Sequence, residues 1–148
     1  MTATLSDVGE RFVLALSRKD GAGLRAALAP DVRFRGLTPG RAWEATGVDA
    51  TLDVLFRSWF EAADHIDEVV SHEIHDVVDK IAVRYCFRVC NGDGVFLVEQ
   101  QGYVSLDEQR RMADVAIVCS GYRRSMARVP AKATSATGIR GGSDGRSS

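Results

Sequence analysis

Residues 81–106 read IAVRYCFRVCNGDGVFLVEQQGYVSL, and this stretch decides the fold class. In its first ten residues a large apolar side chain recurs at every second position, which is the period of a strand with one buried face. The segment Asn91–Gly94 is a strong turn signal, and a second apolar run follows it. The stretch therefore predicts two antiparallel strands joined by a tight loop.

The residues on either side extend this hairpin into a sheet preceded by helices. Strand patterns are predicted over 65–78 and 111–120, and a short strand over 32–36. Thr4 and Asp7 have the spacing of a capping box, and the apolar residues that follow at helical spacing predict a helix ending near Arg18. A second helix is predicted between Asp20 and Pro30 and a third from about Thr46 to Ala63, with a loop through Pro39, Gly40 and Trp43 before it. Helices first and a curved, mostly antiparallel sheet second is an α+β layout.

Length and composition exclude several functional classes. The 148 residues suit one domain, and the net charge of −1 with a pI of about 6.3 is not the footprint of a nucleic-acid-binding protein. No apolar run approaches the roughly 20 residues that cross a bilayer, and the first residues lack a signal-peptide pattern. We therefore expect a cytoplasmic protein that binds neither nucleic acid nor membrane.

The end of the sequence differs in composition from the rest. Residues 128–148 are rich in Gly, Ser, Ala and Thr, contain no aromatic residue, and carry an excess of basic side chains. Such a segment cannot bury enough apolar surface to offset the entropy lost on ordering. The sequence therefore predicts a single domain over residues 1–127 and a disordered polar tail over 128–148.

Cysteine and histidine spacing gives no sign of a disulfide or a metal site. Cys86 and Cys90 lie four apart on a predicted strand, about 13 Å from one another, which is beyond disulfide reach. His72 and His75 are three apart on a strand and so face opposite ways. We expect small buried thiols, no metal and no cofactor.

The loop at Asn91–Gly94 sets which residues of the hairpin share a face. A type I turn with Gly94 in the left-handed region makes a three-residue loop that pairs Asn91 with Val95. Counting from that pair places three polar residues on the apolar face of the hairpin: Glu99, Gln101 and Tyr103.

The same counting at the two neighbouring hairpins adds His72 and Asp114 to this face and turns Cys119 away from it. Buried unpaired polar groups cost several kcal/mol. A polar cluster enclosed by apolar residues is therefore expected only where it forms the floor of a cavity, and otherwise it would destabilise the fold. A shift of one residue would reverse the faces. Glu99, Gln101 and Asp114 would then lie outside with arginines, on a solvated or dimer surface.

Several segments resemble the nuclear transport factor 2-like superfamily, and within it the SnoaL-like proteins. They are Asp31-Val32-Arg33-Phe34, the approach Trp43-Glu44 to Gly47, the run from Val98 to Tyr103, and the closing run from Val118 to Arg123. The resemblance covers roughly residues 5–124. It implies a cone, in which a bent sheet wraps around a cavity closed by N-terminal helices, and homodimers that pair through the sheet.

The resemblance also implies a range of activities. The superfamily includes polyketide cyclases, ketosteroid isomerases, epoxide hydrolases and scytalone dehydratases, together with many non-catalytic proteins. Their working residues project from alternate positions of the penultimate strand and from the last strand, and Glu99, Gln101 and Asp114 look similar to that arrangement. Neither the glutamine and histidine of the cyclases nor the arginine and aspartate of the epoxide hydrolases is reproduced.

These observations lead to two functional hypotheses. The first is a cofactor-independent acid–base enzyme of the cyclase, isomerase or dehydratase kind, acting on a hydrophobic oxygenated molecule such as a polyketide or terpenoid intermediate. Desolvation would raise the pKa of a carboxyl in an apolar cone, which suits proton abstraction near neutral pH. The expected working residues are Asp114 as base, with Glu99, Gln101, Tyr103 and His72, and the expected walls are Phe34, Trp43, Trp59, Tyr85 and Phe87.

The second hypothesis is a non-catalytic dimeric module of the same fold that binds a ligand or another protein. In it, Asp114 and Glu99 pair with arginines rather than with a substrate. Fold alone does not decide between the two hypotheses.

Overall fold

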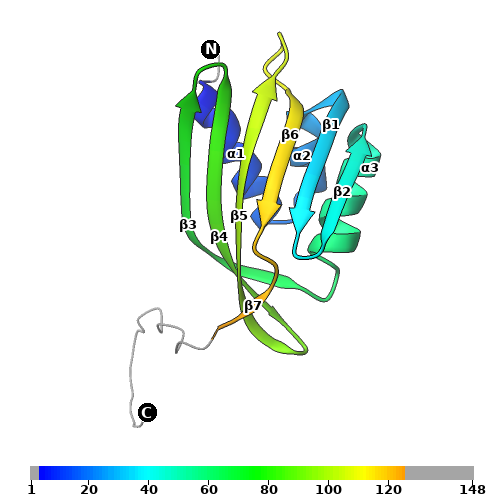
Figure 1. Ribbon diagram of the computed structural model, residues 1–148, viewed down its shortest axis with the longest axis vertical. Coiled ribbons are helices and arrows are strands. Elements are labelled where there is room, and N and C mark those ends of the chain that lie inside the picture. The colour runs from blue at the N-terminus through cyan, green and yellow to red at the C-terminus, as the bar shows by residue number, and fades with distance from the viewer. Residues whose placement is uncertain (1–3, 126–148) are drawn as a thin grey trace.

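The structure is a computed structural model that describes residues 4–125 (Figure 1). The predicted tail of residues 128–148 lies outside the described residues. Short helices precede and interrupt a seven-stranded sheet. The elements are α1 (Leu5–Ser17), α2 (Gly21–Ala27), β1 (Leu28–Thr38), β2 (Arg41–Thr46), α3 (Val48–Asp53), the π-helical η1 (Val54–Trp59), β3 (His65–Val77), β4 (Lys80–Asn91), β5 (Gly94–Leu106), β6 (Met112–Cys119) and β7 (Arg123–Arg124).

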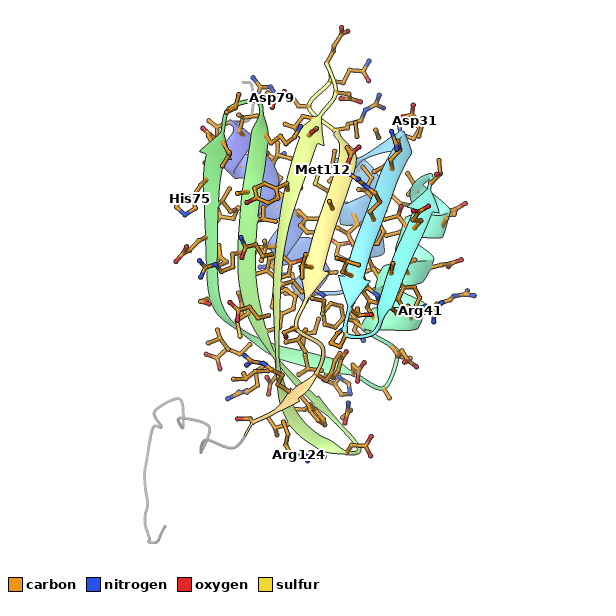
Figure 2. The ribbon with its side chains drawn as sticks, in the orientation of Figure 1. Asp31, Arg41, His75, Asp79, Met112 and Arg124 are labelled. Carbon is orange, nitrogen blue, oxygen red and sulfur yellow. The ribbon has the colours of Figure 1, made fainter. Side chains whose placement is uncertain are left out.

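The sheet is mixed and runs in the order β2-β1-β6-β5-β4-β3, with the short β7 beside β5. Every described pairing is antiparallel except the parallel one between β1 and β6. Figure 1 shows the helices behind one face of the sheet, and Figure 2 marks its two edges, with Arg41 on β2 and His75 on β3. The predicted α+β cone with a bent, mostly antiparallel sheet is confirmed.

The first two helices begin at side-chain caps. At α1 the Asp7 amide donates to Thr4 Oγ1 and the Thr4 amide donates to Asp7 Oδ2, which is the capping box expected from the sequence. At α2 the Gly23 amide donates to Asp20 Oδ1 at 2.9 Å. No helix among residues 4–125 is long and apolar enough to cross a membrane.

The core lies between the helices and the face of the sheet that they cover, which we call the inner face. Its largest side chains are almost completely buried, and α1 touches the sheet through Phe12, whose ring centre is 6.2 Å from that of Tyr85. The core-facing aromatic residues with 1% exposure or less are Phe12, Phe34, Phe60, Tyr85 and Phe87. The opposite, solvent-facing side of the sheet is called the outer face.

Two upstream segments differ from prediction. The stretch after Pro39 and Gly40 is not a loop but strand β2, whose Trp43 pairs with Gly36 of β1. The third helix ends at Trp59 rather than at Ala63, and its second half is π-helical. Strand β2 forms by pairing with β1, and the two segments contact each other where the Trp43 and Trp59 rings meet edge-on at 6.3 Å.

The register of the β4–β5 hairpin also differs, by one residue. Asn91 pairs with Gly94 rather than with Val95, so the loop has two residues rather than three. Asn91 Oδ1 accepts from the Asp93 amide at 2.8 Å, and Arg124 Nη1 donates to the Asp93 carbonyl at 2.9 Å. These contacts hold the tighter loop. A shift of one residue moves every side chain of β5 to the opposite face.

The other two hairpins shift by an even number of residues, so their faces are as expected. His72 pairs with Tyr85, and Tyr103 pairs with Ala116. The predicted faces were therefore wrong at one loop only, and that loop moves the predicted site residues of β5 and β6, but not His72, to the opposite face.

Candidate functional site

The predicted catalytic residues of β5 and β6 lie on the outer face, not inside the cone, and Asp114 is opposite Ser105, six residues along β5 from Glu99. Asp114 Oδ1 is 3.1 Å from Arg35 Nη2, and Glu99 Oε1 is 3.9 Å from Arg123 Nη2. The side chains of Asp114 and Glu99 are 33% and 44% exposed. They are therefore ion-paired with arginines at a solvated surface, and the apolar enclosure expected around them is absent there.

A pocket of about 580 Å³ lies on the outer face, and neither Glu99 nor Asp114 lines it. Gln101 and Tyr103 of β5 line it, together with Trp43 of β2. The small residues Gly36, Ala42 and Ala116 leave room beneath the larger Leu37 and Val118. This outer pocket is of the size that small-molecule sites have, and it is bordered by the charged Arg35 and Glu44.

His72 is separated from the other predicted catalytic residues by the sheet. It pairs with Tyr85 on β4 and so lies on the inner side, as expected. Its Nε2 is 3.5 Å from Glu10 Oε2 of α1, at the margin of the core, and its side chain is 37% exposed. The structure therefore does not bring His72 together with Asp114.

The five predicted wall residues form two clusters that contact the core. Phe34 and Trp43 meet Trp59 edge-on, with ring centres 5.5 and 6.3 Å from it, and Tyr85 lies 5.0 Å from Phe87. Four of them are buried, and Trp43 is half-buried. Whether they contact a substrate stays a prediction.

Trp59 is the unusual member of these clusters. It ends η1, where the Phe60 amide donates to the Leu55 carbonyl five residues back, and π-helical turns are frequent at functional sites. Its ring lies over Gly36, where an added Cβ would come within 2.5 Å of Trp59 Cζ2. Within residues 4–125, the Trp59 Nε1–H is the buried side-chain nitrogen or oxygen group that has no hydrogen-bond partner.

A buried chain of polar groups on the inner face was missed by the sequence reasoning. The Tyr85 hydroxyl donates to Gln100 Oε1 at 2.6 Å, and Gln100 Nε2 donates to Cys119 Sγ at 3.2 Å. Burial raises the pKa of the Tyr85 hydroxyl well above its usual value, so the phenol stays protonated. Cys119 faces inward, contrary to expectation.

One sequence signal could have found Gln100. Along β5 the even-numbered residues Val98, Gln100, Gly102 and Val104 carry no charge, whereas Glu99 is odd-numbered. Buried faces exclude unpaired charge. The even-numbered face is thus the better candidate for the core, and Gln100, not Gln101, is the inward amide.

A second polar cluster fastens the ends of several elements to one another. The Asp64 carboxylate accepts from the Tyr122 hydroxyl and from Asn91 Nδ2, both at 2.8 Å, and from the Glu61 amide at 3.0 Å. Lys19 Nζ donates to the carbonyls of Glu61 and Asp64. We call Asp64, Asn91, Tyr122 and Glu61 the Asp64 clasp. Burial and the hydrogen bond to Asp64 raise the pKa of Tyr122 far above its usual value.

Among residues 4–125 no group of three or more His, Cys, Asp or Glu side chains is arranged to hold a metal ion. The cysteines of the outer face are also unlike reactive thiols. Burial raises the pKa of the Cys86 thiol, and a hydrogen bond to Asp67 raises that of Cys90. Neither residue has the lowered pKa of a nucleophile.

No family model matches the sequence, and a search of curated proteins finds no match. Solved structures do match. An LEH-like epoxide hydrolase from M. tuberculosis is 19% identical with a TM-score of 0.60, covering 76% of this chain and 80% of that one. A candidate SnoaL-like polyketide cyclase from Shewanella putrefaciens is 14% identical with a TM-score of 0.58, covering 81% and 92%.

An NTF2-like protein from Burkholderia xenovorans is 15% identical with a TM-score of 0.57, covering 78% of this chain and 88% of that one. At these identities the likeness establishes the fold alone. The resemblance read from the sequence is thus confirmed at the level of fold.

Proposed function

From a fold shared with SnoaL-like and nuclear transport factor 2-like proteins, we propose that this protein binds a hydrophobic small molecule bearing an oxygen atom inside its cone. The single observation that carries the proposal is the buried, unpartnered Nε1–H of Trp59. A buried donor without a partner costs about 1–3 kcal/mol, so such groups call for an explanation.

A ligand oxygen would supply the missing acceptor. Trp59 lies between the rings of Phe34 and Trp43, which offer apolar surface to the body of such a ligand. A carbonyl or hydroxyl oxygen directed at Nε1 would fix its orientation. Polyketide-like and terpenoid-like molecules have this combination of an apolar body and isolated oxygen atoms.

Acid–base conversion of the bound molecule, of the cyclase, isomerase or dehydratase kind, is the finer proposal. The Tyr85 hydroxyl on the inner face donates to Gln100 Oε1 and burial raises its pKa, so Tyr85 would act in such a reaction as a neutral hydrogen-bonding group and not as the proton donor. Glu99, Gln101, Tyr103 and Asp114 lie across the sheet from Trp59. Of these four, Gln101 and Tyr103 line the outer pocket, so a reaction that used those two would need its substrate there.

We expect the protein to bind 2-acetylnaphthalene more tightly than 2-ethylnaphthalene, which lacks the oxygen. Trp59→Phe should lower affinity for the ketone about fivefold and remove the preference, because a net hydrogen bond is worth about 1 kcal/mol. Isothermal titration calorimetry measures both affinities.

The matched control is Trp43→Phe, since the Trp43 Nε1–H already donates to Thr38 Oγ1 at 2.8 Å. Trp43→Phe should keep the preference for the ketone. Glu99→Gln and Asp114→Asn should also leave both affinities unchanged. Equal losses of preference in Trp59→Phe and Trp43→Phe would contradict the proposal.

A second candidate function is self-association through the outer face. Three apolar side chains around the outer pocket are about half exposed: Leu37 at 52%, Tyr103 at 46% and Val118 at 57%. Contiguous exposed apolar surface of this kind marks interaction sites. In a two-fold dimer the same patch meets itself, and the adjacent Arg35 and Glu44 let opposite charges meet across the axis.

Val118→Lys should shift the dimer strongly toward monomer, because it places an unpaired charge at the centre of the apolar patch. Sedimentation equilibrium of the wild type and the variant measures this shift. Val70→Lys is the matched control, since Val70 is 48% exposed on β3 at the far edge of the sheet. A monomeric wild type, or equal effects of the two lysines, would exclude this interface.

A further inference from the structure

A cavity of about 340 Å³ lies where α1, α2 and the β5–β6 hairpin meet. Its walls come from three separate elements: Val8 and Arg11 of α1, Ala26 and Ala27 of α2, and the hairpin residues Gln109, Arg110 and Arg111. The hairpin end of β6 that borders it is opposite to the end where Ile117 pairs with Gly36, beneath Trp59. The cavity is therefore distinct from the proposed ligand site in the cone.

The residues that line this cavity carry positive charge and no negative charge. Three guanidinium groups line it, and no Asp or Glu side chain does. Arg111 Nε is paired with Asp107 Oδ2 at 3.1 Å. Within residues 4–125, Arg11 and Arg110 make no ion pair. Arg11 and Arg110 therefore leave two positive charges without an ion-pair partner around one cavity, and a bound anion would neutralise them.

Hydrogen bonds of Asp107 define the backbone of the hairpin loop without a ligand. Asp107 Oδ1 accepts from the Gln109 and Arg111 amides, both at 2.9 Å, and the Asp107 amide donates to the Arg111 carbonyl. The Arg111 amide is the main cause of the lowered pKa of Asp107, so this carboxylate stays charged and keeps the loop closed. Arg110 adopts a left-handed backbone with φ of 65° within this loop.

We propose that this cavity binds the oxyanion group of a small molecule, a carboxylate or a phosphate. Arg11 and Arg110 supply the unpaired guanidinium groups, which suit planar recognition of either anion. The side-chain amide of Gln109 adds a neutral donor, and Val8, Ala26 and Ala27 offer apolar surface to a short hydrocarbon portion of the ligand.

The test uses inorganic phosphate and benzoate as probes, titrated separately into the full chain at low ionic strength and followed by calorimetry. We expect one site with a millimolar dissociation constant. Arg11→Gln and Arg110→Gln should each weaken binding at least fivefold. Arg57→Gln is the matched control, because it removes the same charge at an exposed position paired with Asp53 on α3.

Each outcome decides the proposal. Binding of phosphate alone, of benzoate alone, or of both, with loss in Arg11→Gln and Arg110→Gln but not in Arg57→Gln, supports the site and identifies the oxyanion it prefers. Circular dichroism of each variant checks that the fold is intact. Absence of binding at millimolar concentration, or an equal loss in Arg57→Gln, overturns it. Neither result depends on the ligand proposed for the cone.

Discussion

Asp64→Ala is expected to lower the free energy of unfolding by about 3 kcal/mol, measured by urea denaturation. Asp64 is 8% exposed, and its carboxylate accepts from Tyr122, Asn91 and the Glu61 amide. Hydrogen bonds to a charged group are worth about 1.5–3 kcal/mol each, and their loss leaves partly buried donors unsatisfied. Part of the loss is recovered, since the Tyr122 hydroxyl also lies 2.7 Å from the Trp59 carbonyl.

Two variants separate the clasp from a general effect of removing charge. Tyr122→Phe should cost about 1 kcal/mol, because it removes one donor. Asp53→Ala removes an exposed carboxylate that pairs with Arg57 at 3.5 Å, and exposed pairs are worth about 0–1 kcal/mol. If Asp64→Ala and Asp53→Ala cost the same, the clasp contributes nothing and its contacts are incidental.

Gln100→Leu is expected to destabilise the protein by about 2–3 kcal/mol, although Leu is more hydrophobic than Gln. Gln100 is 1% exposed and joins the hydroxyl of Tyr85 to the thiol of Cys119. Replacing Gln100 leaves the Tyr85 hydroxyl buried without a hydrogen-bond acceptor, at a cost of about 1–3 kcal/mol. Tyr85→Phe alone leaves Gln100 Oε1 buried without a hydrogen-bond donor in the same way.

The double variant Tyr85→Phe, Gln100→Leu should be more stable than the sum of the single effects predicts. The reason is that it removes both the Tyr85 hydroxyl and the Gln100 amide, so neither is left buried without its partner. Urea denaturation of the four proteins gives the coupling. Gln101→Leu is the control: the same substitution one residue along, at an exposed position, should change stability by less than about 0.5 kcal/mol. Additive single effects, or equal costs at positions 100 and 101, would contradict the observed register.

The elements of this fold are largely readable from its sequence, because they depend on local periods and caps. The alternation in residues 81–90 and the Thr4–Asp7 capping box each belong to a few neighbouring residues, and both were predicted correctly. Strand β2 was not, since Arg41–Thr46 becomes a strand only through its pairing with β1. Local patterns determine whether a segment is a helix or a strand, whereas pairing with another strand determines where a strand such as β2 begins and ends.

The candidate site was harder to predict, because it depends on one loop. Asn91–Gly94 suits a loop of two residues or of three. The choice is reinforced by Arg124, which donates to the Asp93 carbonyl and whose Nη1 would be 2.6 Å from a Cβ added at Gly94. The predicted polar residues Glu99 and Asp114 both lie on the outer face, and the register separates them, since Asp114 pairs with Ser105 while the Glu99 carbonyl accepts from the Ser120 amide. Gln100 occupies the core position that the prediction gave to Gln101.

The parallel pairing of β1 with β6 has a consequence for how the chain is made. Arg33 pairs with Asp114, so the centre of the sheet joins residues from opposite ends of the domain. During synthesis the β1–β2 hairpin and the β3–β4–β5 meander emerge first, each with an unpaired edge that β6 later covers. Pairing across such long separations is slow, and open strand edges attract other chains. The ribosome-bound intermediate that still lacks β6 is therefore the species most exposed to aggregation and most in need of a chaperone.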